Sequence, residues 1–199
     1  MASPTSYQRV TTATDYDASA GRYYLKFDGV DDSLATAAIN FTSTDKMTVF
    51  AGVRKLSDAA VKILVELSAV VDSNSGAFAV FAPSSSNADN YYFRSRGTSS
   101  SNAISSASYA SPITNVLTGI GDISGNVATL RINGTQAGTS ATNQGTGNYG
   151  NYPLFVGRRG ESTLPFNGHL YSLIIRGVAS SASQIASAES YVNSKTGAY

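Results

Sequence analysis

From residue 22 onward, the chain is a series of short runs in which apolar and polar residues alternate, separated by Gly, Asn, Asp and Ser. Runs of about 4–8 residues between such turn-forming residues are typical of an antiparallel β-sandwich. Residues 90–96 show the pattern most clearly, because aromatic and polar side chains alternate there as on a strand with one buried face. The pattern predicts strands at 23–28, 48–54, 62–68, 76–81, 90–96, 116–122, 127–133, 153–158 and 168–176.

The last segment of the chain carries a helical signal instead. Ser181 followed by Gln184 is a capping box, in which the two side chains satisfy free backbone N–H groups at the start of a helix. The predicted helix spans 181–195. Its larger apolar residues fall on one face, which we expect to pack on the sandwich: Ile185, Ala188 and Val192.

Three segments far apart in the chain carry a family resemblance. The first is YYLKFDGVDD at 23–32, and the last is LPFNGHLYSLIIRG at 164–177. Between them, LRING at 130–134 predicts a hairpin with a type I′ turn. Together they resemble LamG-like, concanavalin A-like lectin-glucanase domains, in the version found in structural proteins of tailed phages and prophages, such as tail or head fibres. The resemblance implies a two-sheet antiparallel jelly roll with a short C-terminal helix.

The chain divides into a leader and one domain. Residues 1–21 are polar and rich in Thr, Ser and Ala, so we expect a leader, an arm or a linker there, or the cut end of a longer protein. No linker divides the remainder, and all-β sandwiches run to about 200–250 residues as single domains. We therefore predict one LamG-like jelly-roll domain at 22–199, which includes the helix at 181–195.

Charge and composition limit the partners. The chain has 14 Lys plus Arg against 13 Asp plus Glu, so it lacks the basic excess with which nucleic-acid-binding proteins neutralise phosphates. With 0 Cys, it has no disulfide, thiolate metal site or Cys nucleophile. The N-terminal residues have no apolar signal core, and the most apolar stretch, 59–71, is interrupted by charges and too short to span a bilayer. We expect neither nucleic acid nor membrane as a partner.

Catalysis of the kinds known in the wider superfamily needs residues that this sequence lacks. Retaining glycoside hydrolases use two carboxylates about 5–5.5 Å apart, which the hydrolases of the superfamily place as Glu-x-Asp-x-Glu on one strand. None of Glu66, Glu161 and Glu189 has an acidic partner at that spacing. His169, the single histidine, lies within a predicted strand, and the chain has no Gly-x-Ser-x-Gly elbow. We expect no enzymatic activity and no catalytic residue.

The densest acidic group follows the first strand at 28–32. Hard cations such as Ca²⁺ take carboxylate oxygens, so Asp28, Asp31 and Asp32 are candidate ligands. The same residues also suit a polar turn, in which Asp28 accepts hydrogen bonds from neighbouring backbone amides. Because calcium takes about 6–8 oxygen ligands and no complete loop is present, we favour the turn. The sequence predicts no metal site and no cofactor, with calcium left open at this group.

Carbohydrate binding is the remaining chemistry. Sugars are held by aromatic rings that stack on their C–H faces and by planar polar side chains; the chain has no Trp but 12 Tyr. A glycine-bracketed loop at 147–152 is the first candidate, with Asn148, Tyr149, Asn151 and Tyr152. A strand segment is the second, with Tyr91, Tyr92 and Arg94. Ordinary loop packing of Tyr149 and Tyr152 is an equal alternative.

The resemblance implies a non-enzymatic domain on a phage or prophage virion that recognises cell-surface carbohydrate. The expected partners are cell-surface glycan, other virion proteins and further copies of the chain in a homo-oligomer; the expected location is the virion. Two alternatives stay open: a bacterial secreted carbohydrate-binding module, located outside the cell or on its surface, and a purely architectural assembly domain without a ligand. Fold alone does not choose among them.

Overall fold

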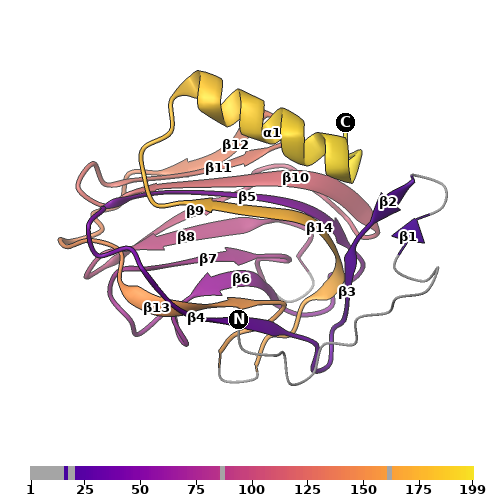
Figure 1. Ribbon diagram of the computed structural model, residues 1–199, viewed down its shortest axis with the longest axis horizontal. Coiled ribbons are helices and arrows are strands. Elements are labelled where there is room, and N and C mark those ends of the chain that lie inside the picture. The colour runs from indigo at the N-terminus through magenta and orange to yellow at the C-terminus, as the bar shows by residue number, and fades with distance from the viewer. Residues whose placement is uncertain (1–15, 18–20, 86–87, 161–162) are drawn as a thin grey trace.

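The computed structural model describes residues 16–17, 21–85, 88–160 and 163–199, in which two antiparallel sheets pack face to face (Figure 1). Sheet 1 has the strand order β12 (Thr135–Ser140), β11 (Val127–Ile132), β10 (Ile113–Asp122), β5 (Lys46–Lys55), β14 (Asn167–Arg176) and β3 (Leu25–Asp28). Sheet 2 has the order β4 (Leu34–Asn40), β13 (Asn151–Val156), β6 (Ile63–Leu67), β7 (Ala77–Phe81), β8 (Tyr92–Arg96) and β9 (Ser100–Ile104). The predicted all-β, two-sheet jelly roll is confirmed.

Two strands of sheet 2, β4 and β9, are absent from the predicted set. Both consist largely of Ala, Ser, Thr and Asn, which give little of the β-branched and aromatic signal on which strand prediction depends. Both are edge strands, so each needs hydrogen bonds and apolar contacts along one side only. Their place in the sheet comes from their neighbours rather than from their own composition.

Most of the predicted leader, and Glu161, lie outside the described residues. Within the leader, β1 (Tyr16–Asp17) is described, and it pairs with β2 (Arg22–Tyr23) as a separate antiparallel pair. The opening run thus divides into β2 and β3, with the acidic turn after β3. The predicted hairpin also forms, since Asn133 and Gly134 have φ values of 50° and 78°, both positive as a type I′ turn requires.

The core lies between the sheets and is built from alternate strand positions. On β8, Phe93 points inward to this core while its neighbours Tyr92 and Arg94 point to the outer face of sheet 2. Alternate residues of each strand therefore lie on the outer face of its sheet, outside the core. The largest buried core side chains include Phe27, Met47, Leu64, Leu67, Phe78, Phe93 and Tyr149.

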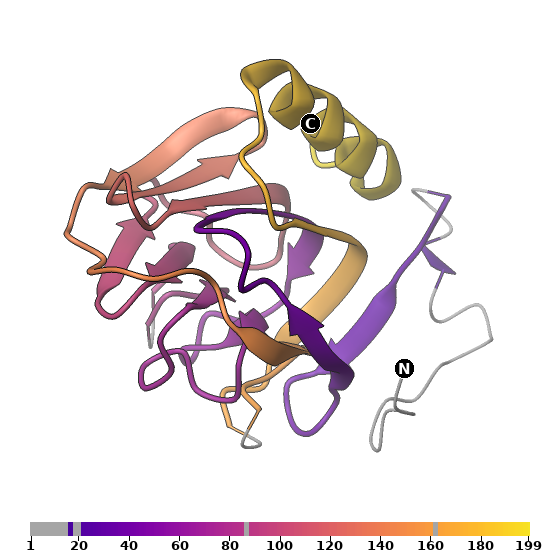
Figure 2. The same ribbon diagram turned by 60° about the vertical axis from the view of Figure 1, so that its left-hand side comes forward.

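One helix of the described residues, α1 (Ala182–Thr196), covers the outer face of sheet 1 (Figure 2). It begins at the predicted capping box, in which the backbone N–H of Gln184 donates to Ser181 Oγ. It ends at Gly197, whose φ of 65° is a left-handed conformation that glycine adopts at low cost. Neither α1 nor any other helix in the described part of the chain combines the length and apolar composition that crossing a membrane requires.

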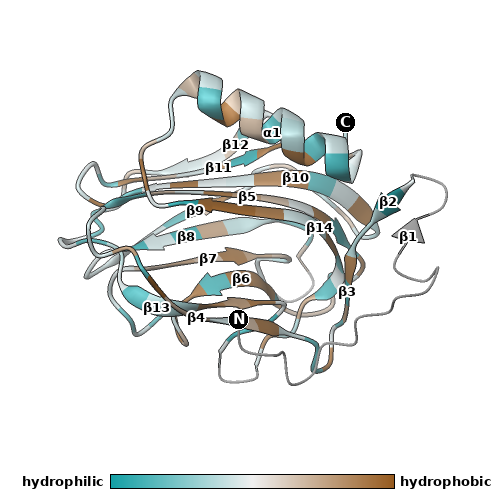
Figure 3. Cartoon of the chain, in the orientation of Figure 1, coloured by the Kyte–Doolittle hydropathy of each residue, from teal (hydrophilic) through white to brown (hydrophobic). Residues whose placement is uncertain are grey.

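The helix docks through its predicted apolar face. Val192 is buried against Phe50 and Val116, and hydrophobic segments lie on β10 and β14 beneath it (Figure 3). Gly52 of β5 permits the close approach, because a Cβ there would lie 1.8 Å from Thr196 Oγ1. The outer face of sheet 1 is therefore occupied largely by the protein itself.

Candidate functional site

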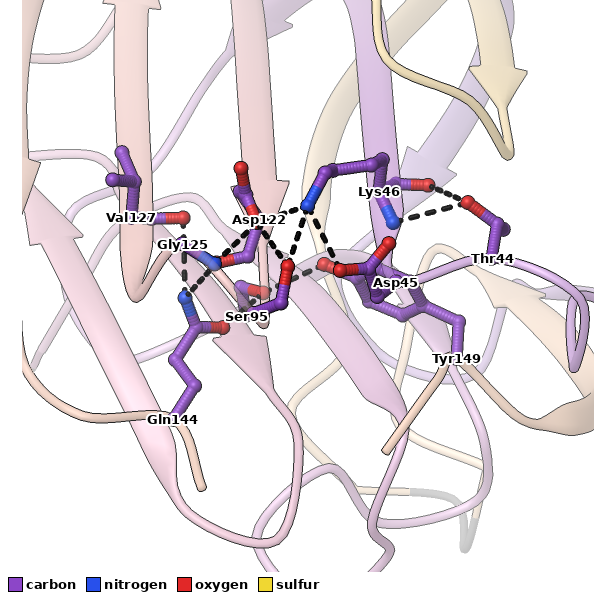
Figure 4. Close-up of polar contacts among 10 residues, drawn as sticks. Thr44, Asp45, Lys46, Ser95, Asp122, Gly125, Val127, Gln144 and Tyr149 are labelled. Carbon is purple, nitrogen blue, oxygen red and sulfur yellow. Dashed lines mark hydrogen bonds and ion pairs between the residues drawn. The ribbon is translucent and has the colours of Figure 1, made fainter. Parts of the chain in front are cut away.

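The predicted binding loop at 147–152 closes one end of the sandwich. Tyr149 has 0% of its surface exposed, because its ring enters the core beside Phe78 and its hydroxyl shares a 2.6 Å hydrogen bond with Ser95 Oγ (Figure 4). Its backbone N–H donates to the carbonyl of Thr44 at 2.9 Å. Of the two alternatives for Tyr149, loop packing is the one observed, and Tyr149 is wrong as a sugar-binding candidate because its ring has no free face for a sugar.

The rest of this loop is fastened to two neighbouring loops. The hydroxyl of Tyr152 donates to the carbonyl of Ser75 at 3.0 Å, and Asn148 Nδ2 donates to the carbonyl of Thr42 at 2.7 Å. Tyr152 is half-buried against the core, whereas Asn148 and Asn151 are exposed. Of the four residues predicted here, the two amides reach solvent, while the two tyrosines hold the loop in place.

A charged network lies at the same end of the sandwich (Figure 4). Lys46 Nζ contacts Asp45 Oδ2 at 2.8 Å, Ser124 Oγ at 2.8 Å and the carboxylate of Asp122. The hydrogen bond from Lys46 is the main cause that lowers the pKa of Asp45 to about 2. Gln144 Nε2 donates to the carbonyl of Asp122 at 2.9 Å. Lys46 and both carboxylates are paired within the network, so we assign it a structural role in joining β5 to the β10–β11 turn.

The second predicted candidate is divided between the two sides of sheet 2. Tyr91 is 0% exposed, and its hydroxyl accepts a 3.1 Å hydrogen bond from Asn115 Nδ2 within the core. The expectation that Tyr91 is exposed is therefore also wrong. Tyr92 and Arg94 lie on the outer face, where Tyr92 is covered and Arg94 is partly exposed. Sequence reasoning placed these three residues together, but the structure brings only Tyr92 and Arg94 to one surface.

Arg94 lies over a pair of stacked aromatic rings. The ring centroids of Phe81 and Tyr92 are 4.6 Å apart, and the Arg94 guanidinium lies 5.2 Å from the Tyr92 centroid and 5.7 Å from that of Phe81. Arg94 Nε donates to the Tyr92 hydroxyl at 2.7 Å and to Asn102 Oδ1 at 3.1 Å. Cation–π contact and two hydrogen bonds fix the orientation of the guanidinium. Tyr92 thus positions Arg94 instead of offering a surface for stacking.

Arg94 belongs to a charged group that we call the sheet 2 cluster: Glu66, Asp72, Arg94, Arg96 and Arg159. Asp72 forms ion pairs with Arg94 and, at 2.8 Å, with Arg159 Nη2. Glu66 is fully buried, and its second carboxylate oxygen lies 3.5 Å from Arg159 Nε. Burial raises the pKa of Glu66 to about 7, although a hydrogen bond from the N–H of Val71 and the charge of Arg159 oppose the rise.

Little in the local sequence indicates this cluster. Alternation along β8 places Arg94 and Arg96 on one face, but Asp72 comes from the β6–β7 loop and Arg159 from the β13–β14 loop. Asp72 and Arg159 are 87 positions apart in the chain. Their contact depends on sheet 2 placing β13 beside β6, and nothing in the local sequence reports that neighbourhood.

The acidic turn after β3 has the hydrogen bonds expected of a turn. Asp28 Oδ1 accepts from the N–H of Val30 at 2.8 Å, and Asp32 Oδ2 accepts from the N–H of Asp28 at 3.0 Å. Carboxylate oxygens of Asp28, Asp31 and Asp32 also lie within 4.8 Å of one another. Three carboxylates supply at most part of the about 6–8 oxygens that calcium takes, and two of them already bond the backbone. The geometry fits the predicted turn.

A groove of about 460 Å³ separates α1 from β14 on the outer face of sheet 1. Ile174 and Ala188 supply apolar surface, Tyr191 stands beside them with 54% of its surface exposed, and Arg176 and Gln184 add polar groups. This is a second surface on which an aromatic ring and planar polar side chains meet. Sequence reasoning assigned its helical residues a structural role only.

Solved structures of several proteins share this fold. A SAP-like pentraxin from Limulus polyphemus has a TM-score of 0.62 at 12% identity, over 82% of this chain and 80% of that chain. The CBM40 of a Ruminococcus gnavus IT-sialidase, solved with α2,3-sialyllactose, has a TM-score of 0.56 at 16% identity. This match covers 77% of this chain and 97% of that chain. Domain 4 of the arabinanase AbnA from Geobacillus stearothermophilus, solved with arabinotriose, has a TM-score of 0.64 at 12% identity. This match covers 82% of this chain and 75% of that chain. At such low identities these likenesses show the fold alone.

Sequence comparison gives a narrower result. A search of curated proteins finds no match for this chain. A family model, however, matches residues 27–186, which takes in the strands from β3 to β14 and the start of α1. Given this match and the two-sheet fold, the chain belongs to the concanavalin A-like lectin/glucanases superfamily.

Proposed function

We propose that this protein is a non-enzymatic glycan-binding domain and that it binds glycan on the outer face of sheet 2, beside β8 and β9. The observation that carries this proposal is the oriented cationic surface on that face. There stacked aromatic rings fix Arg94, and Arg96 lies on the same face of β8. Asn102, which is exposed, lies opposite Arg94 on β9. Guanidinium and amide groups are planar hydrogen-bonding partners for sugar hydroxyl and carboxylate groups.

The comparisons support binding rather than catalysis. The CBM40 and domain 4 of AbnA were each solved with a sugar bound, and both share this fold. Glu66 and Glu189 lie on opposite outer faces of the sandwich, so these two glutamates do not form a pair with each other. Glu66 is fully buried at the base of the β6–β7 loop, where it accepts a hydrogen bond from the N–H of Val71, and its pairing with Arg159 ties the β13–β14 loop to the sheet.

We further propose that the domain acts on a phage or prophage virion, as part of a tail or head appendage. The three segments that resemble phage and prophage domains, at 23–32, 130–134 and 164–177, support this setting. A virion carries many copies of a structural protein, next to other virion proteins and often as a homo-oligomer. Multiple copies compensate for weak single sites, because linked sites raise the effective concentration without any new contact. A secreted bacterial carbohydrate-binding module is the alternative setting for the same binding surface.

A glycan array probed with a multivalent display of the domain tests the binding proposal. Wild type is compared with Asn102→Ala and Arg96→Ala on sheet 2, and with Lys26→Ala as a matched loss of an exposed cation on sheet 1. We expect both sheet 2 variants to lose most of the signal and Lys26→Ala to keep it, with equal melting temperatures. Tyr191→Ala is tested as well, and loss of the array signal in this variant alone would place the site in the α1–β14 groove. Absence of any wild-type signal would support the architectural alternative.

The virion setting has a separate test. Particles released from a bacterium that carries the gene are purified, and their proteins are identified by mass spectrometry. We expect the chain among the particle proteins. Its presence in the culture medium and absence from the particles would support the secreted module.

A further inference from the structure

The side chain of Asp72 is held as a carboxylate ligand would be held. One of its oxygens contacts Arg94 Nη1 and the other accepts from Arg159 Nη2 at 2.8 Å. Two guanidinium groups from different strands and loops thus share one carboxylate. Charge-assisted bonds of this kind are the usual way in which arginine recognises carboxylates.

We propose that Arg94 and Arg159 form a binding site for the carboxylate of an acidic sugar, and that Asp72 occupies this site when no ligand is bound. This inference rests on the proposed glycan-binding function and specifies its ligand class. Binding exchanges one carboxylate for another, so the two guanidinium groups keep a charged partner in both states. The exchange avoids leaving a partly buried charge without a partner, which is costly.

The charge balance of the cluster favours an additional anion. Besides burial, the charges of Arg159 and Arg96 both lower the pKa of Arg94, so the three guanidinium groups lie close enough to repel one another. Against these three positive charges stand Asp72 and Glu66. Burial raises the pKa of Glu66 to about 7, so at neutral pH this carboxyl is ionised in only part of the molecules. The cluster therefore has a net positive charge.

The position of Asp72 makes the exchange feasible. Its side chain is 47% exposed, against 17% for Arg94 and 15% for Arg159, so Asp72 is the outermost of the three. The preceding residue, Val71, is fully buried, and Glu66 accepts a hydrogen bond from its N–H. The base of the loop is thereby anchored, and rotation of the Asp72 side chain uncovers both guanidinium groups without moving a strand.

Neighbouring side chains suit the rest of a sugar. Asn102 is exposed and already bonded to Arg94 Nε, and Ser100 accepts from Arg96 Nη1 at 3.0 Å. Both lie on β9, alongside the two arginines of β8. An acidic sugar whose carboxylate sits between Arg94 and Arg159 would meet these amide and hydroxyl groups with its own hydroxyls.

The experiment measures the affinity for sialyllactose, lactose and sulfated lactose by isothermal titration calorimetry. It compares wild type with Asp72→Asn, which removes the competing charge at nearly constant shape, and with Asp45→Asn as a matched change in the other ion-pair network. Displacing an internal competitor that fills the site about nine-tenths of the time gains on the order of tenfold in affinity. We expect that gain for sialyllactose with Asp72→Asn, no gain with Asp45→Asn, and no gain for lactose.

Arg159→Lys provides the converse test, because lysine keeps the charge but loses the planar fork that matches a carboxylate. We expect it to weaken sialyllactose binding and to leave the melting temperature within a few degrees of wild type. An equal gain for sulfated lactose would assign the site to anions in general. Glycan binding by wild type with no gain in Asp72→Asn would overturn this inference and leave the proposed function intact, whereas no glycan binding by any variant would overturn both.

Discussion

The two outer faces of the sandwich are both covered, but by different chemistry. On sheet 1, α1 is held by apolar contacts of Val192 with Phe50 and Val116. On sheet 2, the base of the β6–β7 loop is anchored by Val71, which is buried in an apolar cluster with Tyr92, whereas the exposed side chain of Asp72 is held by charges between two arginines. If the helix undocks, its buried apolar surface is exposed to water and its stabilisation is lost. An arginine in an ion pair loses little free energy when another carboxylate replaces the first. The helix is a permanent cover, and the side chain of Asp72 is an exchangeable one.

A comparison of one ion pair from each face shows the same difference between a permanent and an exchangeable cover. Beneath the helix, Arg131 donates from Nε and Nη2 to the two oxygens of Glu189, at 2.8 and 3.1 Å. This carboxylate belongs to an almost fully buried residue of the helix, so no ligand reaches it. Asp72 is half-exposed on a loop. Burial of the acid, and not the presence of arginine, separates a structural ion pair from a candidate site.

The largest expected effect is on the helix-covered face. Phe50→Ala removes a fully buried ring between β5 and α1, and we expect a loss of about 3–5 kcal/mol in the free energy of unfolding. Ser187→Ala, an exposed change on the same helix, is the control and should leave stability nearly unchanged. Urea denaturation measures both. A loss below about 1 kcal/mol for Phe50→Ala would mean that the helix does not depend on this contact.

The charged outer face of sheet 2 should instead make the free energy of unfolding depend on pH. The pKa of Glu66 is about 7 in the folded chain against an ordinary value of 4.5, so the folded state binds this proton more tightly. The resulting stability is fully present below pH 4.5 and is lost as pH rises through 7. Between about pH 5 and pH 8, we expect wild type to lose roughly 2–3 kcal/mol relative to Glu66→Gln.

Urea melts of wild type and Glu66→Gln across that pH range measure this difference. The charged groups that act on Glu66, namely Arg159 and Arg94, are present in both proteins, so their contributions largely cancel in the comparison. Parallel curves for wild type and Glu66→Gln would contradict the raised pKa. They would also weaken the argument that the sheet 2 cluster carries excess positive charge.

A smaller effect is expected between the two faces, at the end of the sandwich. Tyr149→Phe removes the hydroxyl that bonds to Ser95 Oγ and should cost about 1 kcal/mol, because one buried hydrogen bond is lost while Ser95 Oγ keeps its bond to Gln144. Tyr23→Phe, at a largely exposed tyrosine, is the control. Glycan binding should be unchanged in both variants. A change in binding with unchanged stability would return the loop at 147–152 to the candidate sites.

The smallest expected effect concerns calcium. With Asp28 and Asp32 bonded to the backbone of their own turn, we expect the same melting temperature with added calcium and with EDTA. A bound ion would stabilise the folded state by mass action. A calcium-dependent rise of several degrees that Asp31→Asn abolishes would show that this turn is a metal site, and would add a third region to the comparison.

The sequence predicts the fold well because the signals are local. Alternation along β8, the turn at Asn133-Gly134 and the capping box at Ser181 each depend on residues close together in the chain, and the structure confirms each of them. The edge strands β4 and β9 escape prediction because small polar residues give no such signal.

The candidate site is predicted poorly, for the same reason. Tyr149 and Tyr91 stand next to turn-forming residues, which suggests exposure, but both rings are buried in the core, and Arg94 covers Tyr92. Among the strand candidates, Arg94 keeps a partly exposed, oriented position, while Asn148 and Asn151 stay exposed on the loop. Its partners Asp72 and Arg159 come from distant loops, so their contact follows from the strand order of sheet 2 and from no local pattern.

The most direct measurement is an NMR titration of the ¹⁵N-labelled domain with sialyllactose, which reports each backbone amide separately. If the outer face of sheet 2 binds glycan, the shift changes concentrate on Asp72, Arg94, Arg96 and Asn102, and α1 stays unchanged. Changes concentrated on Tyr191 and the strand end at Arg176 would contradict the account, because they would place the glycan on the face that the helix covers.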